Sequence, residues 1–135
     1  MFPPNTKVLV VDDFKTMLKI VINSLSQIKI TDVTEADDGA TGLPLVEAAA
    51  AEGKPFGLII SDWNMPILQG IEFLKKVRAN PATKDTPFVL LTAEAEQKNV
   101  IEAVQAGVSN YIVKPFAPNV FAEKLLVVYK KHFPG

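Results

Sequence analysis

The chain has 135 residues, 48% of them hydrophobic, and a formal net charge of −1, which suits one domain with a substantial core. Acids and bases are mixed along the chain, so nucleic-acid binding is not expected, and the absence of cysteine excludes disulfides, thiolate nucleophiles and cysteine-ligated metals. The first residues do not resemble a signal peptide and every apolar run is too short to cross a bilayer, so we expect a cytoplasmic protein without a membrane partner.

Five segments of strand length, four of them largely apolar, alternate with five segments of helical spacing. The expected strands are 7–11, 31–36, 57–61, 88–91 and 110–113, and the expected helices are 14–27, 39–52, 70–79, 96–106 and 118–131. Asp38 can cap the second helix, while Gly53 and Gly107 can end the second and fourth helices. Pro44 lies inside the second helix and predicts a kink or a later start.

This alternation predicts an α/β fold with helices on both faces of a parallel sheet. Right-handed crossovers leave few arrangements, and the expected one is the flavodoxin-like, doubly wound sheet of five strands in the order 2-1-3-4-5. Strands 1 and 3 are then neighbours at the centre of the sheet.

Polar residues stand where four of the expected strands end, namely Asp12 and Asp13, Asp62, Thr92 and Lys114. Neighbouring strands 1 and 3 would bring three carboxylates together, and their mutual repulsion needs a counter-charge. A hard divalent cation with oxygen ligands supplies it, and a site with two or three carboxylates suits Mg²⁺. On its own, the Asp12-Asp13 pair would more often cap a helix than hold a metal, and Asp13 could do both.

Thr92 and Lys114 suggest what binds beside the metal. A hydroxyl and an ammonium group opposite a cation describe a clamp for a phosphoryl group. The nucleophile between them is the carboxylate of Asp62, so the pattern predicts phosphoryl transfer to an aspartate.

Five motifs resemble the receiver domain of two-component response regulators, and most closely the chemotaxis regulators among them. They are Val-Val-Asp12-Asp13, Ser61-Asp62-Trp63-Asn64-Met65-Pro66, Leu91-Thr92-Ala93-Glu94-Ala95, Gln105-Ala106-Gly107 and Tyr111-Ile112-Val113-Lys114-Pro115-Phe116. The resemblance covers about residues 7–131. It implies that residues 1–135 form a single receiver domain with no fused output domain.

The resemblance also implies roles for individual residues. Asp62 would be the phosphoacceptor, and Asp12, Asp13, Asp62 and the backbone carbonyl of Asn64 would bind Mg²⁺. Lys114 would pair first with Asp62 and then with the phosphoryl group. Thr92 would move toward that group and Tyr111 would turn inward behind it, although Tyr111 could equally be a packing residue of an edge strand. The Lys114–Pro115 bond would be cis. Asn64 and Glu94 would set how fast the phosphoryl group is lost to water. Residues 93–96 would be the loop that moves when the domain switches.

The implied protein is a signalling switch and not an enzyme, because it catalyses only its own phosphorylation and dephosphorylation. Its phosphodonor would be the phosphohistidine of a chemotaxis histidine kinase. Its effector would be a flagellar motor switch protein, or another target, bound on the face formed by the fourth helix, fifth strand and fifth helix. A phosphatase could be a further partner. Val100, Val104 and Lys124 mark that face, although the apolar residues there could simply cover a large core.

Three other readings use the same residues. A phosphorelay shuttle would have the same site. A small phosphatase with an aspartate nucleophile would need Asp-x-Asp and a cap, whereas here the acids are adjacent and 135 residues leave no room for one. A flavodoxin-like cofactor binder would need a phosphate-binding loop after the first strand.

We further expect Trp63 to be packed within its loop and His132 to be solvated in a frayed last turn.

Overall fold

The computed structural model describes residues 1–93 and 97–134. Its five strands are all parallel and lie in the order β2-β1-β3-β4-β5, so the predicted doubly wound fold is confirmed. The strands are β1 (Val8–Val11), β2 (Val33–Ala36), β3 (Leu58–Asp62), β4 (Phe88–Thr92) and β5 (Asn110–Val113). The helices are α1 (Lys15–Gln27), α2 (Gly39–Ala51), α3 (Gly70–Ala79), α4 (Gln97–Gln105) and α5 (Pro118–His132).

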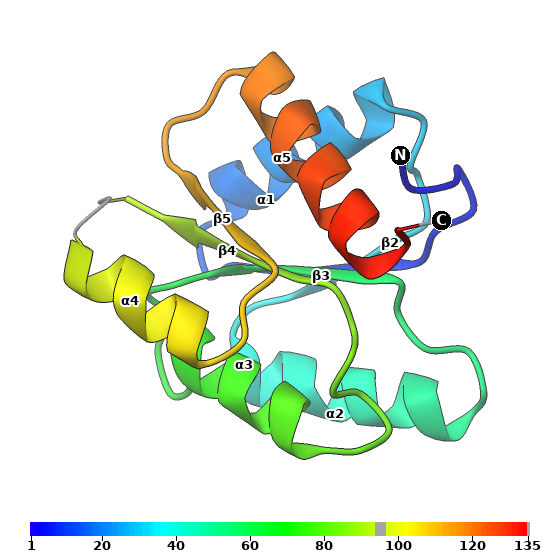
Figure 1. Cartoon of the computed structure of the whole chain (residues 1–135), viewed down its shortest axis with the longest axis vertical. Helices are drawn as coiled ribbons and strands as arrows, with labels where there is room; N and C mark the ends of the chain where they lie inside the picture. The colour runs from blue at the N-terminus through cyan, green and yellow to red at the C-terminus, as the bar shows by residue number, and fades with distance from the viewer. Residues whose placement is uncertain (94–96, 135) are drawn as a thin grey trace.

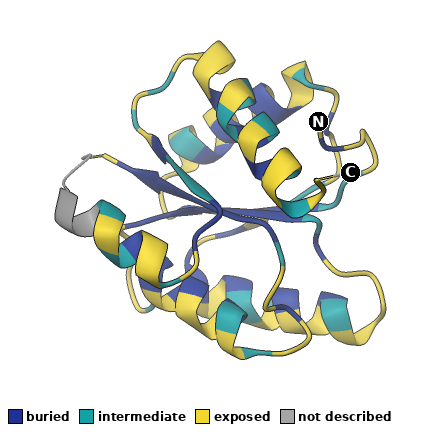
Figure 2. Cartoon of the chain, viewed as in Figure 1, coloured by how far each residue is buried: buried dark blue, intermediate teal, exposed yellow. Residues whose placement is uncertain are grey.

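The sheet is buried on both faces (Figures 1 and 2). Helices α1 and α5 cover one face, and α2, α3 and α4 cover the other (Figure 1). Successive residues of β1 therefore enter different cores: Val8 and Val10 pack with α1 and α5, whereas Leu9 and Val11 pack with α2 and α3. This is why the central strands are continuous apolar runs and do not alternate with polar residues.

The helix ends follow the expected chemistry. The carboxylate of Asp38 accepts a hydrogen bond from the backbone N–H of Thr41 at 2.8 Å, which caps α2. Gly53 and Gly107 adopt the left-handed φ values of +76° and +90° that end α2 and α4. A later start for α2 was wrong, because the helix runs unbroken from Gly39 with Pro44 inside it. The carbonyl that Pro44 leaves without an amide partner belongs to exposed Ala40, where water can reach it.

Several boundaries differ from those expected. β2 begins at Val33, not at residue 31, while β3 and β4 each continue one residue further, to Asp62 and Thr92. The last residue of each longer strand is thus a polar residue held by the sheet itself. No helix among the described residues is long and apolar enough to cross a membrane.

Candidate functional site

Three carboxylates meet at the carboxyl ends of β1 and β3. These strands pair in register with Val11 opposite Ser61, and the residues that follow bring oxygens of Asp12, Asp13 and Asp62 within 4.8 Å of one another. Asp12 is fully buried and Asp62 is 6% exposed, whereas Asp13 is exposed. The cluster is therefore open to solvent on the side of Asp13 and closed on the side of Asp12.

Asp12 has the properties expected of a carboxylate that binds a cation. Its Oδ1 accepts a hydrogen bond from the N–H of Phe14 at 2.9 Å, whereas its buried Oδ2 has no hydrogen-bond partner within the part of the chain that is described. Burial, with a smaller contribution from the charge of Asp62, raises the pKa of Asp12 to about 6. An orphaned buried oxygen beside two further carboxylates fits a hard cation such as Mg²⁺.

Lys114 reaches this cluster from the far side of β4. Its Nζ lies 2.9 Å from Oδ1 of Asp62, and the backbone N–H of Trp63 donates to the same oxygen at 2.9 Å. The backbone N–H of Lys114 in turn donates to the carbonyl of Thr92 at 2.7 Å. The side chain of Lys114 is 17% exposed, so its charge faces the carboxylate in partly dehydrated surroundings. The Lys114–Pro115 peptide bond is cis, as expected.

Thr92 is the last residue of β4 and is 4% exposed. The sheet register sets Asp62 opposite Leu91 and Thr92 opposite Val113, so Thr92 lies between the strand ends that carry Asp62 and Lys114. The structure therefore brings a hydroxyl, an ammonium group and three carboxylates to one edge of the sheet. A phosphoryl group on Asp62 would have a cation site on one side and Lys114 and Thr92 on the other.

Residues 8–126 match the family described as "Response regulator receiver domain". The chain belongs to this family. The receiver is 44% identical to the chemotaxis protein CheY-3 of Vibrio cholerae over 127 aligned residues. The alignment covers 94% of each chain. It is 42% identical over 125 residues to the chemotaxis protein CheY of Pseudomonas aeruginosa, covering 93% of this chain and 97% of that one.

The fold agrees with that membership. The solved structure of the chemotaxis response regulator CheY4 of Vibrio cholerae aligns with a TM-score of 0.81 at 35% identity, over 92% of this chain and 98% of that one. A receiver domain from Francisella aligns with a TM-score of 0.78 at 32% identity, over 94% and 98% of the two chains.

Of the other residues with expected roles, the structure describes Asn64 and Tyr111. Asn64 is exposed in the loop that follows β3. Tyr111 is partly buried, packs against the core that includes α3 and α4, and has Nζ of Lys124 4.9 Å from its ring centre. Glu94 and most of the expected moving loop lie outside the described residues.

Two expectations about side chains near the site have clear outcomes. Trp63 is packed as expected, at 8% exposed. Asp13 does not cap α1, because the N-cap residue is Phe14 and makes no side-chain cap; Asp12 instead binds the N–H of Phe14. The charge of Asp13 is therefore not used by the helix end.

The expectation for His132 was wrong. This residue belongs to α5, and its Nε2 lies 2.6 Å from Oγ of Ser109, a hydroxyl that also accepts the backbone N–H of Phe88 at 3.0 Å. Burial first, and then the nearby charges of Arg78 and Lys131, lower the pKa of His132. The pair ties the last turn of α5 to β4 and β5, at the opposite end of the sheet from the carboxylates.

Gly70 is a site residue that sequence reasoning missed. Its N–H donates to the carbonyl of Trp63 at 2.9 Å, and a Cβ at this position would overlap the carbonyl oxygen of Asp62. Only glycine lets α3 begin this close to the strand end that carries Asp62. The glycine in Gln69-Gly70 was visible as a helix start, but its contact with Asp62 depends on the loop path.

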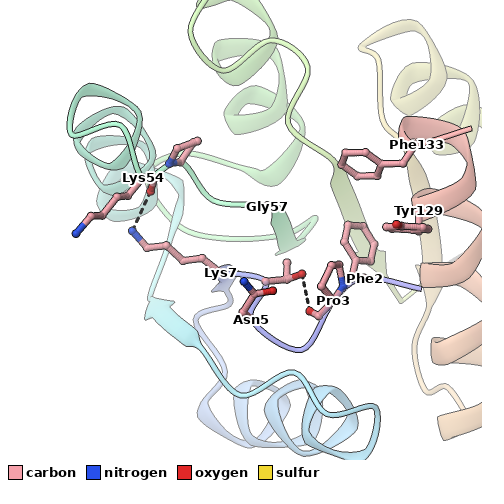
Figure 3. A pocket seen from close by; sticks show the side chains of 10 residues that line it. Phe2, Pro3, Asn5, Lys7, Lys54, Gly57, Tyr129 and Phe133 are labelled. Carbon is pink, nitrogen blue, oxygen red and sulfur yellow. Dashed lines mark hydrogen bonds between the residues drawn. The ribbon is translucent and has the colours of Figure 1, made fainter. Parts of the chain in front are cut away.

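A groove of about 380 Å³ lies at the amino ends of β1 and β3 (Figure 3). Aromatic rings of Phe2, Tyr129 and Phe133 form one wall, and Lys7 and Lys54 lie toward the other. Phe2 is buried, with its ring 5.3 Å from that of Tyr129. Because none of the candidate site residues lines this groove, it is separate from the carboxylate cluster.

Proposed function

We propose that this receiver accepts a phosphoryl group on Asp62 from the phosphohistidine of a histidine kinase and acts in chemotaxis on the flagellar motor switch. The observation that carries the proposal is the 2.9 Å contact between Lys114 and Asp62 at the edge of the three-carboxylate cluster. The chemotaxis assignment is supported by the names of the relatives in Vibrio cholerae and Pseudomonas aeruginosa.

The residues of the chain account for the transfer. An oxygen of Asp62 attacks phosphorus, the phosphorus–nitrogen bond breaks, and the imidazole leaves with its electron pair and takes up a proton. Two donors, Lys114 and the N–H of Trp63, hold Oδ1 of Asp62 and so fix the plane of the carboxylate. After transfer, the ammonium of Lys114 and the hydroxyl of Thr92 would stabilise the charge on the phosphoryl oxygens.

Asp12, Asp13, Asp62 and the backbone carbonyl of Asn64 would hold Mg²⁺. When bound, the ion would neutralise the cluster and the charge that develops on the transferring group. The chain contributes the fixed positions of Asp12, buried at the end of β1, and of Asp62 at the end of β3. Asp13 is the exposed carboxylate of the set, so an ion would enter from its side.

The output would leave through α4, β5 and α5. Thr92 is the last residue of β4 and Lys114 directly follows β5, so a phosphoryl group that engages them would bias these elements toward an active arrangement. Val104 on α4 and Val127 on α5 are 64% and 55% exposed, which supports a contact surface and not merely a covered core. Tyr111, between them on β5, would respond to the movement of Thr92.

Incubation with acetyl phosphate and Mg²⁺, followed by intact mass measurement, tests the proposal. One added phosphoryl group is expected, and both EDTA and Asp62→Asn should abolish it. Asp37→Asn is the matched control, because Asp37 is an exposed acid that follows β2 and should not affect the mass gain. An undiminished gain in Asp62→Asn would refute the assignment of the phosphoacceptor.

A further inference from the structure

The loop between β3 and α3 contains a turn of unusual backbone geometry. The N–H of Leu68 donates to the carbonyl of Pro66 at 2.7 Å, so the chain reverses around the single residue Ile67. Ile67 has a φ of +67°. This combination describes a γ-turn of the rare and strained kind.

Isoleucine is a poor residue for this turn. A β-branched side chain at positive φ crowds the backbone, and glycine or asparagine would fit with less strain. The side chain of Ile67 is also 86% exposed, so burial within the chain offsets almost none of that cost. Two unfavourable features at one position point to a role outside the folding of the domain.

Hydrogen bonds on both sides hold the turn in place. The carbonyl of Leu68 accepts the N–H of Gly39 at 3.3 Å, and the N–H of Gly70 donates to the carbonyl of Trp63 at 2.9 Å. The loop is thus anchored to α2 and closed upon itself, so that Ile67 is presented from a constrained backbone. A side chain presented in this way loses little further freedom when a partner covers it.

A second exposed apolar residue stands on the other loop that carries the cluster. Phe14 directly follows Asp13, its N–H binds Asp12, and its side chain is 61% exposed. Each of the two loops that adjoin the carboxylates therefore displays one large apolar side chain. Phe14 and Ile67 are here called the apolar rim.

We propose that the apolar rim is the contact surface for the protein that donates the phosphoryl group, and that Ile67 sets the preference for a protein donor over a small-molecule one. This inference rests on the proposed function. A phosphohistidine can reach Asp62 only from the edge of the sheet where the two loops lie, so its protein must cover that edge. The partner surface that fits carries apolar side chains around the histidine, whereas acetyl phosphate is too small to need the rim.

Two substitutions at one position separate contact from strain. Ile67→Asn and Ile67→Leu both remove the β-branch, but only leucine keeps a large apolar side chain. Each variant is phosphorylated by acetyl phosphate and, separately, by an autophosphorylated chemotaxis histidine kinase that phosphorylates the wild-type chain. Ile67→Asn should slow transfer from the kinase about tenfold or more, because a buried isoleucine contact is lost. Its rate with acetyl phosphate should stay within about twofold of wild type, and Ile67→Leu should stay close to wild type with both donors.

The outcomes distinguish the two proposals. An equal loss with both donors would overturn the inference, since it would mean that Ile67 acts by shaping the pocket. Kinase transfer at the wild-type rate in Ile67→Asn would overturn it as well. If acetyl phosphate does not phosphorylate the wild-type chain and no chemotaxis histidine kinase does so, the proposed function itself fails.

Discussion

Lys114 and Asp62 are 52 residues apart in the chain, yet a 2.9 Å ion pair joins their side chains. β4 lies between the strands that carry them, so the lysine reaches across one strand to the central acid. This pairing places a fixed positive charge beside the oxygen expected to receive the phosphoryl group.

Lys114→Met should therefore slow phosphorylation by acetyl phosphate by about 100-fold, the effect of losing one preorganised charge at a reacting group. Circular dichroism should show an unchanged fold, since Lys114 belongs to no apolar core. Lys114→Arg keeps the charge but changes its shape and reach, so an intermediate rate is expected. Rates in both variants equal to wild type would mean that Lys114 has no part in the transfer.

Thr92→Ala should still be phosphorylated, but phosphorylation should no longer alter the conformation of β5 and α5. The hydroxyl of Thr92, at the end of β4, is the group that would move toward the phosphoryl oxygens on Asp62. Amide chemical shifts of β5 and α5, recorded before and after phosphorylation, should move in the wild type and remain nearly fixed in Thr92→Ala. Thr92→Ser retains the hydroxyl and should respond as the wild type does; a full response in the alanine variant would reject this coupling.

Asp12→Asn should have opposite effects on metal binding and on stability. Loss of a carboxylate should weaken Mg²⁺ binding at least about tenfold, as measured by calorimetry. Because burial raises the pKa of Asp12 to about 6, its ionised form at neutral pH opposes folding, and the uncharged amide should stabilise the metal-free chain by up to about 3 kcal/mol in urea unfolding. Asp37→Asn should change neither quantity. Destabilisation of the metal-free Asp12→Asn variant would contradict this account.

Gly70→Ala should damage the site through the backbone of Asp62. The added methyl group overlaps the carbonyl oxygen of Asp62, so the loop or the strand end must shift, at a cost of about 1–3 kcal/mol. Phosphorylation by acetyl phosphate should fall along with stability. Gly53→Ala provides the comparison: its φ of +76° gives a strain of about 1–2 kcal/mol, but nothing lies within 4 Å of the new methyl group, so phosphorylation should be unaffected.

The single histidine should make stability depend on pH. The pKa of His132 is lowered in the folded chain, so below the ordinary value of 6.5 the unfolded chain binds the proton more readily, and stability falls as the pH decreases through this window. Asp12, with its raised pKa, acts in the opposite direction, so the contribution of His132 is read from the difference between wild type and His132→Gln. The advantage of the wild type over the variant should shrink between pH 7.5 and pH 5. A constant difference across that range would exclude this role.

The sheet and most of the site were predictable because both follow from short-range patterns. Largely apolar runs identified four of the five strands, and the polar residues at their ends identified Asp12, Asp62, Thr92 and Lys114. Strand order then brought these positions together, and it came from the known behaviour of flavodoxin-like folds.

The remaining features depend on where separate segments come to lie in space. His132 appeared to belong to a frayed end because no pattern in the chain reveals that the last turn of α5 reaches Ser109. The strain at Ile67 arises from a turn that neighbouring Pro66 and Leu68 form, and the contact of Gly70 with Asp62 arises from the path of the same loop. Backbone approaches of this kind have no signature in hydrophobic periodicity.

Under the proposed function, the parallel arrangement of β1, β3, β4 and β5 would also determine when the domain can signal. No single segment of the chain contains the charged cluster, since its members arrive on four strand ends, and Lys114 leaves the ribosome long after Asp12 and Asp13. A newly made or damaged copy that has not completed its sheet should not accept a phosphoryl group efficiently. Signalling would then require completed folding, and misfolded copies would transmit no signal.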